Sequence, residues 1–203
     1  MKTNSEKTRC FWATDVPDFY KQYHDEEWGV PCFDEHKMFE MLILEGAQAG
    51  LSWQTVLAKR ETYRKAFDQF NVEKIAKYSE AKVQKLMLDA GIIRNQLKIR
   101  AAITNAQALQ TLRETAPRPE FALTDFFWKY VDGKPKQNAL KSRADIKATT
   151  AESDALSKAL KKAGFKFVGS TIVYAHMQAC GMVNDHLTSC WRYEAVREMG
   201  RKL

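Results

Sequence analysis

Two pairs of possible metal ligands lie at opposite ends of this chain. Cys10 and His24 are near its start, and His186 and Cys190 are near its end. Thiolates and neutral imidazoles are good zinc ligands, and two of each complete a closed tetrahedral site. His186 and Cys190 are four residues apart, so on a helical turn they would face the same way. A closed site leaves no open position for water, so the metal would hold structure and would not activate a nucleophile.

Spacing alone leaves this metal interpretation open. Cys10 and His24 do not have the spacing of a zinc finger, and further possible ligands are present. They are Cys32, Cys180, His36 and His176. The alternative is that the chain carries separate buried cysteines and surface histidines. Four cysteines in a chain of 203 residues do not suggest a disulfide scaffold.

Aromatic residues are concentrated in the first quarter of the chain, close to one carboxylate in apolar surroundings. The aromatic residues are Trp12, Tyr20, Tyr23, Trp28 and Trp53. Glu45 sits among the apolar residues of the 41–49 segment, where a carboxylate either turns to solvent, which is the commoner case, or is retained to bind something. Aromatic faces and one carboxylate together would suit a flat cationic ring, such as an alkylated purine.

The segment from Leu160 to Tyr174 is predicted to be a helix, a tight turn and a second helix. A helix beginning at Gly169 would present free backbone N–H groups to an anion, and glycines let a phosphate approach closely. Phe165 and Phe167 would anchor the turn, and Lys161 would add positive charge. The residues expected to contact DNA are Lys162, Gly164, Lys166, Gly169 and Ser170. The alternative is an ordinary helix–helix connection that a glycine ends.

Helical periodicity extends over nearly the whole chain and predicts the elements that must position these residues. Helix starts are expected at Asp34, Ser52, Ser79 and Thr124, and at Thr150 or Ser153. Gly91 should end the helix that follows Ser79, and a long helix should cover about residues 96–113. The polar and basic 133–150 segment is expected to be an exposed connection. Because no alternating strand pattern is convincing, an all-α fold is predicted.

Composition favours one domain, or one domain with two lobes, and a polyanionic partner. The chain has 203 residues and a formal net charge of +7, with a pI near 9.2, which is compatible with nucleic-acid binding. No apolar run reaches the roughly 18 residues that a membrane span needs, and the first residues lack the apolar core of a signal peptide. A cytoplasmic protein that does not enter a membrane is therefore expected.

Several motifs, taken together, resemble those of the DNA-3-methyladenine glycosylase I family, which belongs to the helix-hairpin-helix glycosylases. The motifs are Arg9–Trp12, Tyr23–Pro31, Phe39–Gly46, Gln48–Trp53, Asp89–Arg94, Gly164–Gly169 and Met177–His186. The resemblance covers roughly residues 9 to 190. It implies a single all-α domain over 1–203, with the helix-hairpin-helix at about 153–180. It also implies one structural Zn²⁺ that joins the 10–24 and 186–190 segments through Cys10, His24, His186 and Cys190.

The resemblance further implies an activity and a set of site residues. The enzyme would flip 3-methyladenine out of double-stranded DNA and hydrolyse the N-glycosidic bond, leaving an abasic site. Glu45, Tyr23 and Trp53 match base-pocket residues, and Trp12 and Trp28 fall at matching aromatic positions. Asp185 is a further catalytic candidate, unless it only orders the zinc site, and Leu51 is a candidate for the residue that fills the duplex gap.

No lysine is clearly placed as a Schiff-base nucleophile, so a monofunctional enzyme without strand cleavage is expected. A monomer is also expected. The alternatives are a non-catalytic sensor of alkylated DNA and, from charge alone, a general nucleic-acid binder. Loss of excision with retained DNA binding in a Glu45→Gln variant would distinguish an enzyme from a sensor.

Overall fold

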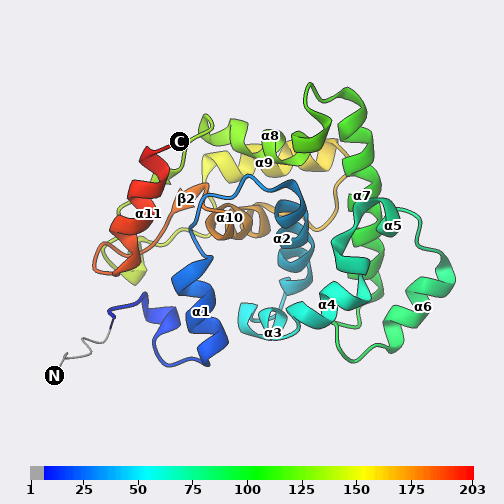
Figure 1. Cartoon of the computed structure of the whole chain (residues 1–203), viewed down its shortest axis with the longest axis horizontal. Helices are drawn as coiled ribbons and strands as arrows, with labels where there is room; N and C mark the ends of the chain where they lie inside the picture. The colour runs from blue at the N-terminus through cyan, green and yellow to red at the C-terminus, as the bar shows by residue number, and fades with distance from the viewer. Residues whose placement is uncertain (1–6) are drawn as a thin grey trace.

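The structure is a computed structural model that describes residues 7–203, and it consists mainly of helices (Figure 1). The α-helices are α1 (Asp18–Glu26), α2 (Glu35–Gln48), α3 (Trp53–Leu57), α4 (Arg60–Ala66), α5 (Val72–Ile75), α6 (Glu80–Leu88), α7 (Gln96–Thr115), α8 (Ala122–Trp128), α9 (Ala151–Lys162), α10 (Ser170–Ala179) and α11 (Arg192–Arg201). Short 3₁₀ helices are η1 (Phe11–Ala13), η2 (Asp68–Phe70), η3 (Pro119–Phe121), η4 (Lys129–Val131) and η5 (Arg143–Asp145). The predicted mainly helical fold is confirmed.

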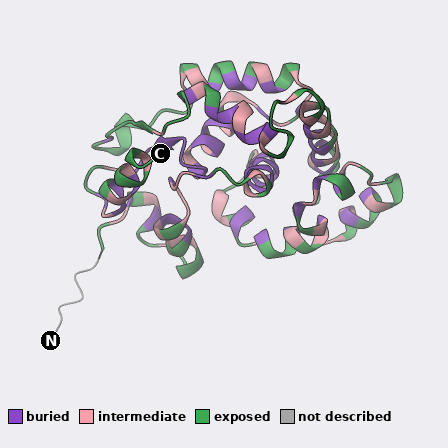
Figure 2. Cartoon of the chain, turned by 45° about the horizontal axis from the view of Figure 1, so that its top comes forward, coloured by how far each residue is buried: buried purple, intermediate pink, exposed green. Residues whose placement is uncertain are grey.

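Helix α2 forms the centre of the packing. Every residue from Met38 to Ala47 is buried, and α2 contacts α3, α7, α8 and α10. A helix that is buried on all sides needs no amphipathic pattern, whereas the helices at the rim alternate between buried and exposed residues (Figure 2). Helix α10 packs against both α2 and α9 near the middle of the molecule (Figure 1). Residues on α2 and α10 are therefore held by the core itself.

Most predicted helix starts are confirmed, because a side chain within the local sequence caps them. Asp34, Ser52 and Ser79 each accept a hydrogen bond from a backbone N–H three residues later, at α2, α3 and α6. At α9, Thr150 is the N-cap and Ser153 completes a reciprocal capping box. Helix α6 ends at Leu88 and not at Gly91.

The predicted start of α8 at Thr124 is wrong, because α8 begins at Ala122 and Thr124 lies buried within it. The Glu35 carboxylate accepts hydrogen bonds from the backbone N–H groups of Leu123 (3.0 Å) and Thr124 (2.9 Å). It also accepts one from the Thr124 hydroxyl, at 2.9 Å. A residue at the start of α2 thus caps a helix that lies far along the chain.

The 133–150 segment is mostly exposed, as expected, but it pairs with the C-terminal part of the chain. Strand β1 (Lys136–Gln137) is parallel to β2 (Val183–Asn184), with Lys136 opposite Val183. Leu140 is buried, and its carbonyl accepts a hydrogen bond from the Thr188 N–H at 2.8 Å. No helix in the described residues is both long and apolar enough to cross a membrane.

Candidate functional site

A cavity of about 280 Å³ lies between the N-terminal aromatic residues, α2 and α10. All five residues predicted to bind a base line it, as does Asp185. The five are Tyr23, Trp12, Trp28, Trp53 and Glu45. Gln48, Ile146 and Gln178 also line the cavity, and no role was predicted for these three residues. The structure therefore brings together residues from four separate segments of the chain.

The aromatic rings of the cavity meet one another mainly edge to face. Trp12 and Trp28 have ring centroids 4.9 Å apart and an interplanar angle of 78°. Tyr23, on α1, and Trp53, at the start of α3, have centroids 5.5 Å apart and an angle of 52°. These contacts fix the rings before any ligand arrives, so binding costs little side-chain entropy.

Glu45 carries the unusual chemistry of the cavity. Its side chain is 3% exposed, and its Oε2 atom has no hydrogen-bond partner among the described residues. Burial raises the pKa of Glu45 to about 8. A buried acceptor without a partner is costly. A ligand that donates a hydrogen bond to Glu45 therefore recovers free energy that an apolar ligand of similar size would not recover.

Asp185 faces the same cavity but is engaged by three donors. Its carboxylate accepts hydrogen bonds from Asn138 Nδ2 (2.6 Å), the Tyr174 hydroxyl (2.7 Å) and Gln178 Nε2 (2.7 Å). Burial, and then the proximity of Asp185, raise the pKa of Tyr174, which keeps the hydroxyl protonated as a donor. These contacts tie Asp185 to α10 and to the segment that follows β1.

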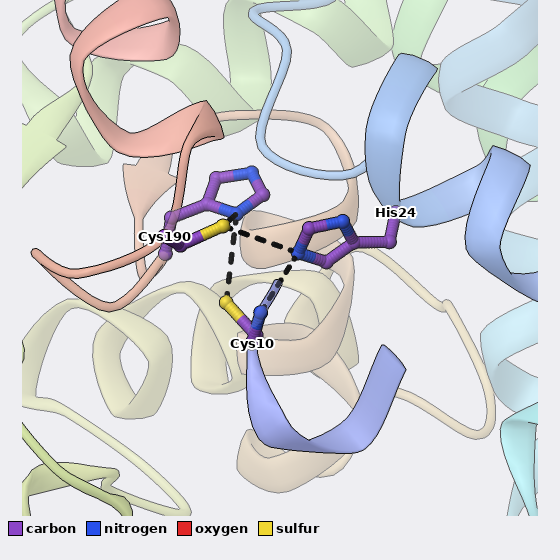
Figure 3. A group of neighbouring side chains, drawn as sticks. Cys10, His24 and Cys190 are labelled. Atoms are coloured by element: carbon purple, nitrogen blue, oxygen red, sulfur yellow. Dashed lines mark hydrogen bonds between the residues drawn. The ribbon is translucent and has the colours of Figure 1, made fainter. Parts of the chain in front are cut away.

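The four predicted metal ligands converge from opposite ends of the chain. Their donor atoms all lie within 4.8 Å of one another, and all four residues are buried. Figure 3 shows Cys10, His24 and Cys190 turned toward one point. Cys190 Sγ lies 3.5 Å from His24 Nε2 and 3.6 Å from His186 Nδ1, and Cys10 Sγ also lies 3.6 Å from His186 Nδ1. The cluster could hold a metal ion.

The geometry fits a tetrahedral ion. Bond lengths of about 2.3 Å to sulfur and about 2.0–2.1 Å to nitrogen give sulfur–nitrogen edges of roughly 3.6 Å in a tetrahedron. Three of the four sulfur–nitrogen distances are 3.5–3.6 Å. The interaction between the two sulfurs raises the pKa of Cys10 and lowers the pKa of Cys190.

The far nitrogens of both histidines are fixed by other groups. His24 Nδ1 lies 2.8 Å from Asp25 Oδ1, and His186 Nε2 lies 3.0 Å from the Trp28 carbonyl. Although burial alone would raise the pKa of Asp25, hydrogen bonds from Arg9 and His24 lower it to about 2. Asp25, and not Asp185, is thus the carboxylate in contact with a cluster histidine. The expected helical turn at 186–190 is wrong: a non-helical turn brings these two ligands together.

The predicted hairpin is present between α9 and α10. Gly164 has φ +93°, a conformation that favours glycine, and Gly169 is the N-cap of α10 with no side-chain cap. The first backbone N–H groups of α10 therefore stay free for an anion. Lys162 and Lys166 are exposed beside the turn.

Two details of the hairpin differ from expectation. Phe165 is buried, but Phe167 is only half-buried, and Val168 is the second core anchor. The Ser170 hydroxyl lies 2.8 Å from that of Ser153 and is engaged within the protein. Asn105, a buried residue of α7 that was not predicted, pairs through its side-chain amide with the backbone of Lys166. Because this contact spans 61 residues, no local pattern announces it.

The chain matches known proteins over most of its length. The model of the methyladenine glycosylase family matches residues 12–193. DNA-3-methyladenine glycosylase 1 of Escherichia coli (strain K12) is 50% identical over 185 residues, which cover 91% of this chain and 96% of that protein. The chain belongs to the methyladenine glycosylase family.

Other members of the family support this relationship in sequence and in structure. The DNA-3-methyladenine glycosylase of Haemophilus influenzae is 45% identical over 183 residues, which cover 90% of this chain and 96% of that protein. A crystal structure of 3-methyladenine DNA glycosylase I has a TM-score of 0.86 at 52% identity, covering 91% of this chain and 98% of the other. The Staphylococcus aureus enzyme, solved to explain 3-methyladenine recognition, has a TM-score of 0.85 at 34% identity, covering 91% and 96%.

Proposed function

We propose that this protein is a DNA-repair enzyme that excises 3-methyladenine from alkylated double-stranded DNA by hydrolysing the N-glycosidic bond. The observation that carries the proposal is the buried, unpartnered Glu45 carboxylate oxygen in an aromatic cavity. The relatives from Escherichia coli and Haemophilus influenzae are named for this activity. The product would be the free base and an abasic site.

Glu45 would select the methylated base through charge and hydrogen bonding. Methylation at N3 makes the purine cationic while it is still attached to the sugar. A nearby cation lowers the pKa of Glu45 and favours the carboxylate, which then accepts hydrogen bonds from the base. Neutral adenine gives no such compensation for a buried charge. Tyr23 and Trp53 would stack on the base, with Trp12 and Trp28 completing the aromatic wall.

Catalysis would need little help for the leaving group, since the cationic base already departs easily. The enzyme would flip the nucleotide out and hold it. The negative charge of Glu45 would stabilise positive charge on the sugar as the bond breaks, and Asp185, which lines the same cavity, is the second carboxylate proposed for this role. No lysine is among the described residues that line the cavity, which supports a monofunctional enzyme without strand cleavage.

The hairpin and the loop after α2 would bind the duplex. We assign α9, the turn and α10 as the helix-hairpin-helix of a single glycosylase domain, with a phosphate at Gly164, Gly169 and the N-terminus of α10, and with Lys162 and Lys166 beside it. Ser170 would contribute its backbone N–H. Leu51, 41% exposed, would fill the gap left by the flipped nucleotide. A monomer in the cytoplasm completes this proposal.

The metal cluster would bind one structural Zn²⁺ through Cys10, His24, His186 and Cys190. The sulfur–nitrogen distances and the Cys₂His₂ donor set support zinc. The ion would join the N-terminal segment to the segment that follows α10. It would also steady Tyr23, which precedes His24 on α1.

The test is excision from methylated duplex DNA by purified protein. Wild-type protein should release 3-methyladenine, and Glu45→Gln should lower the single-turnover rate by roughly 100-fold. Binding to DNA that contains an abasic-site analogue should change by less than about threefold, because that ligand has no base to hold. Release at background by the wild type, with tight binding to methylated DNA, would instead establish the damage-sensor alternative.

A further inference from the structure

Two side chains of α7 hold the backbone of both segments that are proposed to contact DNA. The Lys98 ammonium donates hydrogen bonds to the carbonyls of Ala47 (2.8 Å) and Ala49 (2.6 Å), where α2 ends. The Asn105 amide accepts a hydrogen bond from the Lys166 N–H at 2.7 Å and donates one to the Lys166 carbonyl at 3.1 Å. One helix therefore contacts the loop that carries Leu51 and the turn of the hairpin.

The spacing of these residues on α7 makes a rigid connection. Lys98 and Asn105 are seven residues apart, so they lie on the same face, separated by two turns or roughly 10 Å along the axis. Ile99, Ala102 and Ala106 of the same helix are buried in the core. A helix that is packed between its two contacts cannot easily change their separation.

The two held segments also touch each other. A Cβ atom built on Gly46 would lie 3.3 Å from Phe167 Cβ, closer than most such contacts. The glycine thus lets the end of α2 approach the hairpin turn. Phe167 has φ +53°, and the Asn105 hydrogen bonds lie on the residue just before it. The hydrogen bonds that Lys98 and Asn105 make to the two segments form a clamp on them. The close approach of Gly46 involves Phe167, which directly follows the clamped Lys166.

We propose that Lys98 and Asn105 are positioning residues that set the distance and orientation of the Gln48–Leu51 loop relative to the hairpin. When the hairpin is held on its phosphate, α7 places Leu51 at the gap in the duplex and Gln48 and Glu45 at the flipped base. This inference rests on the proposed function. Its physical basis is that small misplacements of groups that hold a substrate reduce rates strongly, by up to about 100-fold for 1 Å.

A purely structural alternative exists for each residue. Lys98 could only satisfy carbonyls at the C-terminus of α2, and Asn105 could only satisfy a turn. That role would lower stability, and any effect on activity would be the same for every substrate. Positioning predicts a difference between substrates, because single-stranded methylated DNA has no gap to fill, whereas a duplex does.

The experiment compares single-turnover release of 3-methyladenine from duplex and single-stranded methylated DNA. Lys98→Met keeps the aliphatic stem and removes the ammonium, and Lys98→Arg keeps the charge. Lys85→Met, at an exposed position of α6, controls for the loss of one positive charge. Lys98→Met should slow release from the duplex about 10-fold and from single strands less than about threefold, with Lys98→Arg recovering part of the loss. Equal losses on both substrates would overturn the proposal.

A double variant tests whether the two residues act together. Asn105→Leu should also slow excision from the duplex more than excision from single strands. If Asn105→Leu does not fold, it is replaced by Asn105→Asp, which keeps the acceptor and the volume. Both contacts are needed to fix one separation. The double variant with Lys98→Met should therefore lose little more duplex excision activity than the more impaired of the two single variants. Losses that multiply would show independent roles and would contradict the inference.

A readout without catalysis separates this inference from the proposed function. In the free protein, amide hydrogen exchange at Ala49–Leu51 should be faster in Lys98→Met than in Lys85→Met, since the loop has lost its clamp. Unchanged exchange would contradict the clamp whatever the activity. If wild-type protein released no 3-methyladenine at all, the proposed function would fail while the exchange experiment still reported on the clamp.

Discussion

Burial of Glu45 makes the free energy of unfolding depend on pH. A carboxylate with an ordinary pKa of 4.5 that burial raises to about 8 favours the protonated state in the folded protein. Below pH 4.5 the folded and unfolded states are both protonated, so burial costs no ionisation energy. As the pH rises from 4.5 to about 8, Glu45 ionises in the unfolded state but stays protonated in the folded state. The free energy of unfolding therefore falls until the pH passes about 8.

Glu45→Gln should therefore stabilise the protein more at pH 8.5 than at pH 5, because glutamine does not titrate. The free energy of unfolding of the variant minus that of the wild type should be larger at pH 8.5 than at pH 5 by on the order of a few kcal/mol. Urea unfolding at the two pH values measures this difference. Glu114→Gln, at an exposed position near the end of α7, is the control and should show little pH dependence. A pH-independent gain for Glu45→Gln would show that its carboxylate is not isolated from charge or solvent.

At the residue scale, the sequence was informative where a residue type was unusual for its surroundings. Glu45 stood out as a charge among apolar residues, and the five tryptophans and tyrosines of residues 12–53 stood out by number. Gln178 and Asn105 did not, because a polar residue on a helix is ordinary until its partners are known. Their roles depend on contacts with Asp185 and with the Lys166 backbone, which only the fold brings near.

At the element scale, local capping decided which helices the sequence could locate. Asp34, Ser52 and Ser79 lie immediately before their helices, so their acceptors are visible in a window of four residues. Helix α8 lacks such a residue and takes its acceptor from Glu35 on α2, 88 residues before Leu123. The position of this helix start was therefore not accessible to a local argument.

Replacement of Glu35 tests this distant cap. Glu35→Ala removes the acceptor of three hydrogen bonds at the start of α8, and we expect a loss of about 2–3 kcal/mol in the free energy of unfolding. Glu35→Gln, which keeps one acceptor oxygen, should lose less. Glu120→Ala, exposed in η3 just before α8, is the control. Urea unfolding measures all three, and a loss below about 0.5 kcal/mol for Glu35→Ala would mean that water replaces the carboxylate.

At the scale of the whole molecule, the cluster of two cysteines and two histidines joins segments that no helix connects. The four ligands were identifiable as residue types, but the sequence offered eight cysteines and histidines and no motif of closely spaced ligands. The structure selects four because η1, α1 and the turn before α11 meet. His186 and Cys190 are brought together by a non-helical turn, so their convergence does not depend on the helical spacing that was expected.

Removal of one ligand should affect metal content and stability together. Wild-type protein should contain about one zinc per chain by elemental analysis, and Cys190→Ser should lose most of it. Because a bound ion would close a loop of nearly the whole chain, we expect the free energy of unfolding to fall by roughly 3–5 kcal/mol. Cys32→Ser, a buried cysteine outside the cluster, should keep its zinc. Full stability of a zinc-free Cys190→Ser protein would contradict a structural role for the ion.

The separation of Cys10 and Cys190 also has a consequence for protein synthesis. The four donor atoms cannot meet until the last two ligands have been translated, which at about 5–20 residues per second is roughly 10–35 s after Cys10. Over that interval the Cys10 thiol and the His24 imidazole of the nascent chain have no partners from the C-terminal segment. The four-residue cluster can therefore form only after nearly the whole chain has been synthesised.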